Sequence, residues 1–520
     1  MIRHIFTVGG LTLVSRVTGF LRDVMLAAIL GAGPVADAFF VALRLPNHFR
    51  AIFAEGAFNA AFIPAYARVR ESGGPDPARL FADRIFTMLF ASQVVLLAAA
   101  LFFTPAVIDL LAPGFSGDAV RFPLAVDLTR ITFPYLLLVT IVTLYGGILN
   151  TLQRFASAAA APILLNLSMM ATLALAAFFP TAGHAAAWGV LIAGVLEVLL
   201  LLADARRNGV VAKLRRPVLD EDIRKFFRAL GPATIGSAGT QLALFADTII
   251  ASFLAAGALS ALYYADRLNQ LPIGVIGIAV GTVLLPDIAR RIAGGDEAGA
   301  RHAQNRAIEL TLLLSVPCLV AFVVVPELIM RALFLRGAFT ATDAQAAAAT
   351  LSAYAAGLIA FVLIRSATAP FFARGDTATP VMASLVAVAV NIVFKIALMG
   401  PLAQVGLAIA TSIGAWINLS LVVWLAARRG LFAIDARLKK SLAMLTLAGL
   451  GMTAGLWLAQ SPIRGWASSL PVMRDEAALV LLAIVGAVVY FMLIVILLGK
   501  SWLLGFVRTV TPAGETDKKA

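Results

Sequence analysis

Ionisable side chains lie inside two long apolar segments near the N-terminus, where lipid-facing sequence normally has none. Residues 5–30 contain two arginines and an aspartate, and residues 36–66 contain two acids, a histidine and two arginines. These residues are Arg16, Arg22, Asp23, Asp37, Arg44, His48, Arg50 and Glu55. A charged side chain in the middle of a bilayer costs roughly 2.5–3.5 kcal/mol on insertion scales, so it usually faces water or a partner. The two segments therefore predict a polar, mainly cationic cavity within a bundle of membrane helices.

Arginines dominate this predicted cavity, and their chemistry indicates its ligand. Arg16, Arg22 and Arg267 each have about a helical turn or more of apolar sequence on both sides, so extension to the membrane surface is disfavoured. A planar guanidinium group binds phosphate oxygens in pairs. Several arginines with few carboxylates therefore predict an anionic, phosphate-bearing ligand. Internal ion pairing is the alternative interpretation, and Arg44 suits either an ion pair or extension to the surface.

Acidic residues accompany the arginines. Asp23, Asp247 and Asp266 are placed to neutralise arginines when no ligand is bound, and Asp247 alternatively binds a cation. Asp37 and Glu55 lie near opposite ends of residues 36–66. That separation favours gates or salt bridges over acid–base catalysis.

No arrangement of residues predicts an enzyme. The sequence has no phosphate-cradling GxxxxGK loop, no HExxH and no GxSxG. The four histidines make no metal-ligand spacing, and Cys318 is the one cysteine. We therefore predict no catalytic residue, no metal, no cofactor and no hydrolysis of ATP by the chain itself.

Membrane helices are the elements that must position these residues. The 520 residues are 61% hydrophobic and 13% charged, with a mean hydropathy of +0.94. Soluble domains have about 45–50% apolar and about 25% charged residues. We predict an all-α polytopic membrane protein of fourteen transmembrane helices, each long enough to cross a hydrocarbon core of about 30 Å. The predicted spans are 5–30, 36–66, 82–111, 123–149, 156–179, 185–204, 228–255, 259–289, 307–335, 344–372, 378–399, 403–427, 438–460 and 476–499.

The net charge of +13 reflects membrane orientation rather than nucleic-acid binding. Most cations fall in alternate short loops, notably around Arg68, in the 206–228 segment, around Arg290 and in 428–440. Basic loops stay on the cytoplasmic side of a membrane. Both termini are therefore predicted to be cytoplasmic in a multi-pass membrane protein.

An internal repeat organises the chain. LRDVMLAAIL at 21–30 aligns with FADTIIASFL at 245–254, and FIPAYAR at 62–68 aligns with LLPDIAR at 284–290, at an offset near 222 residues. That offset equals six predicted spans, and an even number preserves orientation. The two halves should be parallel repeats about an axis along the membrane normal, with the ligand site between them.

The repeat divides the chain into five predicted parts. Residues 1–210 form an N-terminal lobe of spans 1–6, and residues 231–430 form a C-terminal lobe of spans 7–12. Residues 211–230 form an amphipathic linker with acids in its first turn and basic residues later, as the helix dipole favours. Residues 431–500 contribute two further spans, and residues 501–520 form a cytoplasmic tail.

Five stretches resemble one known family. They are SRVTGFLRD at 15–23, ADAFFVALRLPNHFR at 36–50, IFAEGAFNAAFIP at 52–64, YYADRLNQLPIGV at 263–275 and FFARGDTATP at 371–380. Together they resemble the MurJ (MviN) family, the lipid II flippases of bacterial peptidoglycan synthesis. The resemblance covers residues 1 to about 500. It implies the fold of the multidrug and oligosaccharidyl-lipid exporter superfamily, with two six-helix lobes and two C-terminal helices that form a groove for the polyprenyl tail.

The resemblance also implies roles for individual residues. Arg16, Arg22, Arg50 and Arg267 match the arginines of the family's cavity, with Asp23 beside the pyrophosphate contact. Asp37 and Glu55 match acids important for gating or function. Some members bind sodium through four positions, of which Asp247, Asn391 and Thr411 match here, whereas the fourth position, an aspartate in those members, is Lys395.

These implications give an expected function. The protein is expected to flip lipid II to the outer leaflet by alternating access, with the membrane potential as driving force and the coupling ion left open. Lipid II and membrane lipids are the expected partners, cell-wall synthesis proteins are candidate partners, and a monomer is expected. The alternatives are a flippase for another polyprenyl-linked saccharide, a multidrug antiporter of the same superfamily, and a membrane-embedded glycosyltransferase.

Overall fold

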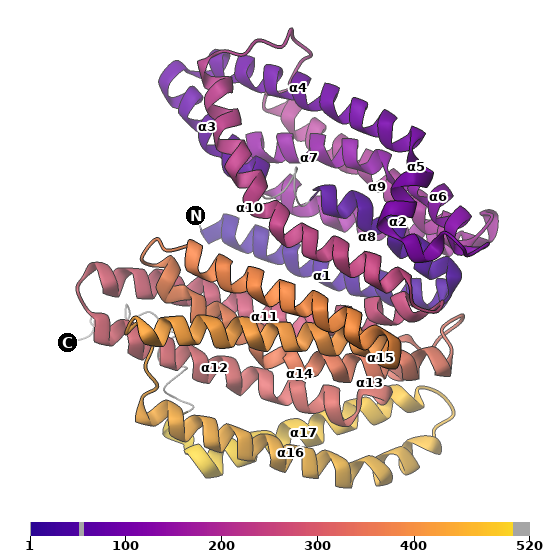
Figure 1. Ribbon diagram of the computed structural model, residues 1–520, viewed down its shortest axis with the longest axis vertical. Helices are drawn as coiled ribbons and strands as arrows, with labels where there is room; N and C mark the ends of the chain where they lie inside the picture. The colour runs from indigo at the N-terminus through magenta and orange to yellow at the C-terminus, as the bar shows by residue number, and fades with distance from the viewer. Residues whose placement is uncertain (1, 51–56, 503–520) are drawn as a thin grey trace. The chain divides into compact units, whose positions relative to one another are not determined.

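The computed structural model describes residues 2–50 and 57–502, and in these ranges the chain forms helices and no strand (Figure 1). The first half contains α1 (Ile2–Leu30), α2 (Pro34–Arg50), α3 (Ala57–Gly73), α4 (Pro75–Phe102), α5 (Thr104–Leu111), the 3-10 helix η2 (Pro113–Phe115), α6 (Arg121–Thr132), α7 (Pro134–Thr151), α8 (Ala156–Ala174), η3 (Ala176–Phe178), α9 (Ala182–Arg207) and α10 (Glu221–Ser252). The second half contains α11 (Ala258–Ala293), α12 (Glu297–Val324), α13 (Pro326–Phe334), α14 (Ala341–Phe372), α15 (Ala378–Arg428), α16 (Ala436–Ser468) and α17 (Arg474–Leu498).

Local sequence sets where these helices begin. Asp220, Asp296 and Asp435 are the N-cap residues of α10, α12 and α16, and each side chain accepts a hydrogen bond from a first-turn backbone N–H. Proline at the first or second position opens α4, α5, α7 and α13, where its missing N–H costs nothing. The helix starts are therefore encoded within a few residues of each boundary.

Nine helical segments in the described residues are long and apolar enough to cross a membrane. This confirms a helical protein with many candidate spans, and it does not confirm the predicted count of fourteen. α2 and α3 cover described parts of the predicted span 36–66 and have 17 residues each, and residues 51–56 lie outside the described ranges. α15 is counted once over 51 residues, although Ala403 inside it has φ 46° and ψ −129°. That break falls at the predicted boundary between spans 378–399 and 403–427.

The pair α12–α13 repeats the local design of α4–α5. Each pair has a 28-residue helix, a break at a single residue, and a helix of eight or nine residues with proline in its first turn. The breaks are at Phe103 and Val325. An internal duplication predicts this agreement between distant parts of the chain.

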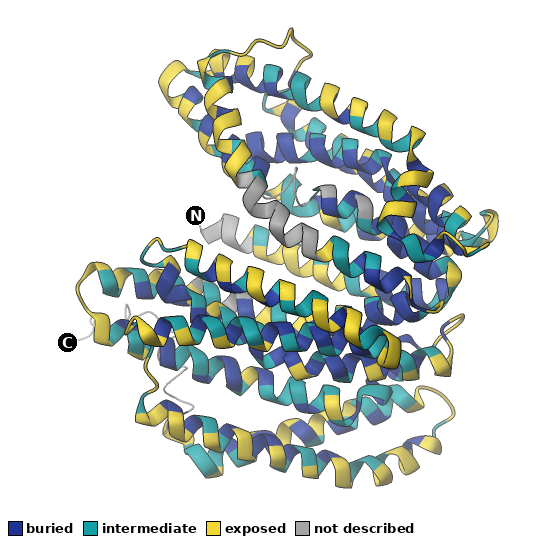
Figure 2. Ribbon diagram, viewed as in Figure 1, coloured by how far each residue is buried: buried dark blue, intermediate teal, exposed yellow. Residues whose placement is uncertain are grey.

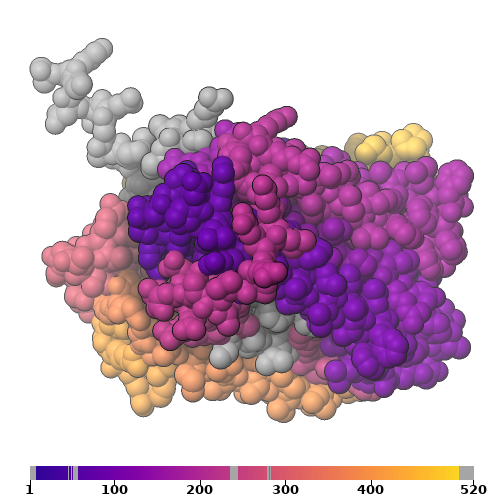
Figure 3. Space-filling model, turned by 90° about the horizontal axis from the view of Figure 1, so that it is seen from above, coloured from indigo at the N-terminus to yellow at the C-terminus, as the bar shows by residue number. Residues whose placement is uncertain are grey.

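The chain divides into two compact units. Unit 1 comprises residues 1–260 with 336–343, and unit 2 comprises 261–335 with the residues from 344 onward. Unit 1 therefore includes α10. Within it α10 lies against α3 (Figures 1 and 3), and Phe226 of α10 packs edge-on against Phe58, Phe62 and Phe81. This aromatic cluster is buried and forms one core of unit 1 (Figure 2).

Residues 211–230 do not form one separate helix. Residues 210–219 have no regular structure, and 221–230 are the first turns of α10. The irregular part is fastened to α4, since the backbone N–H groups of Lys213 and Arg215 donate to Asp83 (2.8 Å) and Thr87 (2.9 Å). Arg84 also pairs with the cap residue Asp220. Of the apolar residues in this segment, Ile223 is fully buried in unit 1, whereas Leu219 is 58% exposed and Phe227 is 40% exposed.

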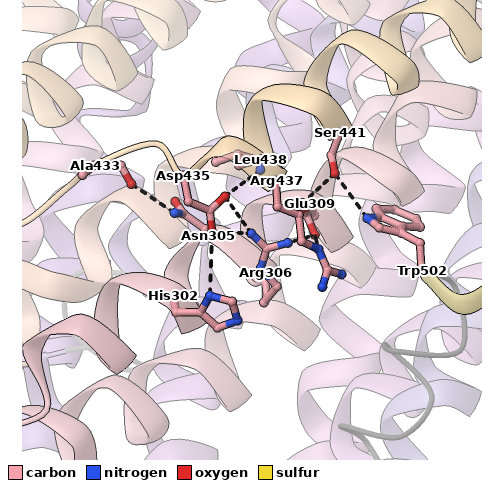
Figure 4. Close-up of polar contacts among 10 residues, drawn as sticks. All are labelled: His302, Asn305, Arg306, Glu309, Ala433, Asp435, Arg437, Leu438, Ser441 and Trp502. Atoms are coloured by element: carbon pink, nitrogen blue, oxygen red, sulfur yellow. Dashed lines mark hydrogen bonds and ion pairs between the residues drawn. The ribbon is translucent and has the colours of Figure 1, made fainter. Parts of the chain in front are cut away.

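A buried polar network joins α16 to α12 inside unit 2 (Figure 4). Glu309 of α12 is fully buried, 2.5 Å from Arg306 and 3.4 Å from Arg437, and it accepts a hydrogen bond from Ser441 at 2.6 Å. The indole N–H of Trp502, just after α17, donates to the same Ser441 hydroxyl at 3.2 Å. Arg306 also contacts both oxygens of Asp435, at 2.8 and 2.6 Å. We call these six residues the Glu309 network. The network attaches the beginning of α16 and the residues that follow α17 to α12.

Candidate functional site

Arg22 is the best-defined cation inside the helices of unit 1. Its side chain is 10% exposed, and its Nε and Nη2 atoms donate to Oδ1 of Asp23 at 3.1 and 2.8 Å. Its Nη1 atom donates to Oδ1 of Asn166 on α8 at 2.9 Å. A long, flexible side chain is thereby held in one orientation. The structure thus brings together the predicted pair Arg22 and Asp23.

Asn166 is a site residue that sequence analysis missed. It is 4% exposed, and its amide nitrogen donates to the Ser15 carbonyl and to the Thr18 hydroxyl, both at 3.0 Å. Gly19 lets α8 approach, since a Cβ at that position would lie 3.4 Å from the Asn166 amide nitrogen. Asn166 therefore bridges the α1 backbone and the Arg22 guanidinium. An asparagine within the apolar residues 156–174 was the available signal.

The arrangement around Arg22 suits reversible anion binding. Asp23 and Asn166 satisfy part of the guanidinium while no ligand is present, which reduces the cost of burying the charge. A phosphate group offers more acceptor oxygens in the bidentate geometry that arginine favours. The site can therefore exchange internal hydrogen bonds for bonds to an anion.

Arg16 differs from Arg22 in its surroundings. It lies earlier on the same helix, α1, and is exposed. Within residues 2–50 and 57–502, no carboxylate lies within ion-pair distance of it. Among the described residues, Arg16 therefore has no internal ion pair.

Two basic residues of α2 contact α10 within unit 1. Arg44 donates to the Thr248 hydroxyl at 3.2 Å, and the ring of buried His48 lies 4.6 Å from that of Phe245. Arg50 is half-buried and is the last described residue of α2. Glu55 lies outside the described residues. The Arg44 contact is with a neutral hydroxyl next to Asp247, and the predicted salt-bridge role of Arg44 stays a prediction.

Asp37 holds the beginning of α11. It is fully buried and accepts hydrogen bonds from the Gly257 N–H at 2.8 Å, the Ser260 N–H at 2.9 Å and the Ser260 hydroxyl at 2.5 Å. First-turn N–H groups of a helix favour a negative partner. In the described part of the chain no cation is within ion-pair distance of Asp37. The aspartate thus acts as a helix cap supplied by a distant helix.

Further contacts fasten the connection between α10 and α11. Arg121 at the start of α6 donates to the Leu254 carbonyl at 3.0 Å and lies over the Phe115 ring at 4.5 Å. Hydrogen bonds from the backbone and side chain of Arg121 lower the pKa of Asp118 to about 2. Asp118 therefore stays ionised at physiological pH. The residues that follow α10 are tied to both α2 and α6.

Arg267 and Asp266 lie on the part of α11 that belongs to unit 2. Arg267 is exposed, and its guanidinium lies over the Tyr263 ring at 4.7 Å. Asp266 accepts a hydrogen bond from Gln270 at 3.4 Å. Convergence of Arg267 with Arg16, Arg22 and Arg50 stays a prediction, because Arg267 belongs to unit 2 and the other three belong to unit 1.

The three matched cation-site residues also divide between units. Asp247 is half-buried on α10 in unit 1, whereas Asn391 and Thr411 lie on α15 in unit 2. Lys395 is 3% exposed, one turn after Asn391. Gly414 packs against Asn391, since a Cβ there would lie 3.0 Å from the Asn391 Cβ. Among the described residues no cluster of three or more His, Cys, Asp or Glu side chains could hold a metal ion.

Comparisons with known proteins identify relatives along nearly the whole chain. A family model described as "Lipid II flippase MurJ" matches residues 26–507. A protein of Rhizobium meliloti named "Probable lipid II flippase MurJ" is 40% identical over 88% of this chain and 86% of its own length. The "Lipid II flippase MurJ" of Burkholderia cenocepacia is 32% identical over 97% of this chain and 98% of its own length.

Solved structures share the fold. A structure of "Lipid II flippase MurJ, inward closed conformation" matches with a TM-score of 0.79 and 23% identity, covering 94% of this chain and 98% of that one. An inward-facing multidrug transporter of the MATE family matches with a TM-score of 0.65 and 14% identity, covering 82% and 96%. At these identities the likeness concerns the fold alone.

Proposed function

The chain belongs to the MurJ family of lipid II flippases, and from this premise we propose that it carries lipid II from the inner to the outer leaflet by alternating access. It is a transporter and not an enzyme, and its role is in peptidoglycan synthesis. The observation that carries the proposal is the buried Arg22 guanidinium, held by Asp23 and Asn166 inside an apolar helix bundle.

The pyrophosphate of lipid II is the group that such a cation should bind. Arg22 exchanges its contacts with Asp23 and Asn166 for phosphate oxygens, and Arg16, Arg50 and Arg267 add charge around the same group. Arg16 is exposed, and in the part of the chain that the structure describes no carboxylate lies within ion-pair distance of it, which supports its contact with a ligand. Asp37 and Glu55 serve as gating residues. The hydrogen bonds from the first turn of α11 to Asp37 support this role, because they would form in one conformation of the transport cycle and break in another.

The finer architecture follows from the repeat. Fourteen helices form two pseudo-symmetric six-helix lobes, supported by the matching designs of α4–α5 and α12–α13. The polyprenyl tail lies along α16 and α17, whose exposed side chains include Leu447, Leu450 and Ile496. The Glu309 network keeps this helix pair attached to unit 2.

The membrane potential supplies direction. Moving one negative charge out of a negative interior is worth about 2.3 kcal/mol per 100 mV. The transport cycle uses no cofactor, and Lys395 takes the place of an aspartate in the sodium-binding pattern, so its ammonium supplies the positive charge that sodium supplies elsewhere. We expect flipping to be independent of sodium. Replacing external sodium with potassium at constant membrane potential should leave the rate unchanged.

The protein works as a monomer in the inner membrane, with both termini cytoplasmic, where cell-wall synthesis enzymes supply and consume lipid II. The alternation of basic loops supports this orientation. A cysteine at each end of the chain, labelled from the outside in intact cells, should stay unmodified.

The deciding experiment replaces the flippase of a bacterium with this chain. After depletion of the host protein, wild-type chain should restore growth and expose lipid II on the outer face, where an added lipid II hydrolase cleaves it. Arg22→Ala and Arg267→Ala should leave lipid II on the cytoplasmic side. Arg22→Lys should recover little activity, because lysine cannot form the paired contacts of a guanidinium.

An outcome against the proposal is easily recognised. If the wild-type chain leaves lipid II on the cytoplasmic side of the depleted cells but moves another polyprenyl-linked saccharide to the outer face, the substrate is that saccharide. Arg68→Ala, which removes an exposed arginine of α3, serves as the control and should restore growth normally. A multidrug antiporter is not favoured, since only the fold is shared with that family.

A further inference from the structure

A basic pocket lies where α16 ends and α17 begins, away from the arginines of α1 and α2 in sequence. It has a volume of about 270 Å³ and is bounded by the start of α13, the end of α16 and the first turn of α17, all within unit 2. Its charged lining residues are Glu327, Arg331, Arg464, Arg474 and Asp475. We call it the α16–α17 pocket.

Three arginines give the α16–α17 pocket a surplus of positive charge. Arg331 is paired with Asp475 at 3.1 Å, and Arg474 donates through Nε to the Leu470 carbonyl at 2.6 Å. Arg464 is exposed, and within the described chain neither it nor Arg474 has a carboxylate at ion-pair distance. Arg331 is held by Asp475, and Arg474 is held by the Leu470 carbonyl. The guanidinium groups of Arg464 and Arg474, which have no carboxylate beside them in the described chain, can bind an anion.

The pocket continues into an apolar surface. A wider hollow of about 540 Å³ shares Arg464 with it and is also lined by Trp457, Leu458, Gln460 and Ser461. Trp457 is 71% exposed and Leu458 is 67% exposed. An arginine pocket next to exposed apolar side chains matches an amphiphile with an anionic head and a hydrocarbon chain.

The position of the pocket indicates where such an amphiphile comes from. α16 and α17 are both long and apolar enough to cross a membrane, so the turn between them lies at a membrane surface. Trp side chains prefer this interface, and basic pockets between membrane helices bind phospholipid head groups. A soluble anion would gain nothing from Trp457 and Leu458.

We propose that the α16–α17 pocket binds an anionic phospholipid of the bilayer, with its phosphate at Arg464 and Arg474 and an acyl chain along Trp457 and Leu458. Glu327 lies in the same pocket and has no ion-pair partner in the described chain, so it opposes the phosphate. The site is separate from the proposed binding of lipid II pyrophosphate, and its test does not require flipping.

The test measures lipid adducts by native mass spectrometry of the full chain in detergent, titrated with phosphatidylglycerol or phosphatidylcholine. Phosphatidylglycerol should bind one tight site, and phosphatidylcholine should bind it more weakly. Arg464→Gln should lower the affinity for phosphatidylglycerol about 5-fold, and the double variant with Arg474→Gln should lower it about 25-fold. Glu327→Gln should tighten binding by a similar 5-fold, because it removes the opposing charge.

Matched controls separate a site from general attraction. Arg290→Gln removes an arginine that is 79% exposed in the last turn of α11 in unit 2, and Asp76→Asn removes an acid that is 89% exposed. Both should leave binding unchanged. Arg464 makes no hydrogen bond or ion pair with any described residue, so the Arg464→Gln variant should unfold at the same temperature as the wild type.

Several results would overturn the proposal. Equal retention of both phospholipids, or equal weakening by Arg290→Gln and Arg464→Gln, would show that the pocket is not selective. Displacement by inorganic phosphate would identify a soluble-anion site. Retention of added lipid II at Arg464 without any retention of phosphatidylglycerol would assign the pocket to the transported lipid instead.

Discussion

The Glu309 network allows one energetic prediction to be worked out in detail. Glu309 has no exposed side-chain surface, and two arginines and the Ser441 hydroxyl surround its carboxylate. Removing one partner of a buried ion pair typically costs about 3–5 kcal/mol, because a buried charge loses its partner. Glu309→Gln keeps the volume of the side chain, so no cavity adds to this cost. The change should destabilise the attachment of α16 to α12.

The structure places the cost near the lower end of that range. Arg306 keeps both contacts with Asp435, and Arg437 is 44% exposed, so water can solvate it. We therefore expect Glu309→Gln to lower the free energy of unfolding by about 3 kcal/mol. Ser441→Ala removes a hydrogen bond to a charged group and should cost about 1.5 kcal/mol. Since the two residues are in contact, the double variant should fall short of the sum by about 1 kcal/mol.

Unfolding in mixed micelles provides the assay. Purified protein is titrated with a denaturing detergent, and the loss of helical circular dichroism gives the free energy of unfolding. Glu221→Gln is the matched control, because Glu221 is 65% exposed and pairs with Lys225 at 3.6 Å on the surface of α10. It should cost no more than about 0.5 kcal/mol. If Glu309→Gln costs no more than this control, or if its effect adds fully to that of Ser441→Ala, the reasoning about the network is wrong.

Three further predictions concern other contacts. Asn166→Ala should leave the Arg22 side chain less ordered and lower flipping about 10-fold, with little change in expression, as measured by exposure of lipid II in complemented cells. Asp37→Asn should cost about 1–3 kcal/mol in the same detergent titration, because an amide N–H₂ would face the donors at the start of α11. Hydrogen bonds from the N–H and hydroxyl of Thr379, together with Arg429, lower the pKa of Asp376 from 3.8 to about 2. The ionised Asp376 carboxylate therefore contributes fully to the stability of the fold above pH 3.8, and this contribution is lost as the pH falls toward 2. Between pH 4 and pH 2 the Asp376→Asn variant should lose less stability than the wild type.

Much of the candidate site was predictable because charges stand out in an apolar sequence. Arg22 and Asp23 were expected to be internal, and both are buried in contact with each other. The helices were predictable for the same reason, since apolar length, capping residues and prolines are local features. Family membership was predictable from five short stretches, and the comparisons confirm it.

Asn166 and Glu309 show where sequence reasoning stopped. Asn166 is neutral, so it adds little to a hydropathy profile, and its partner Arg22 is 144 residues away. Glu309 was visible as an acid in apolar sequence, but its partner Ser441 is 132 residues away. Asp37 was expected to serve gates or salt bridges, and its described contacts are with the first turn of α11. The residues next to Asn166, Glu309 and Asp37 in the sequence do not indicate which distant residues these side chains contact.

The sequence by itself determined that this protein is a helical membrane protein of the lipid II flippase family, because hydropathy, charge and short motifs are properties of neighbouring residues. Only the tertiary structure decided which charges are paired and with what. Arg22 meets an asparagine, Asp37 meets backbone N–H groups, and Glu309 meets two arginines. Such pairings depend on which helix faces pack together, and packing depends on the whole chain.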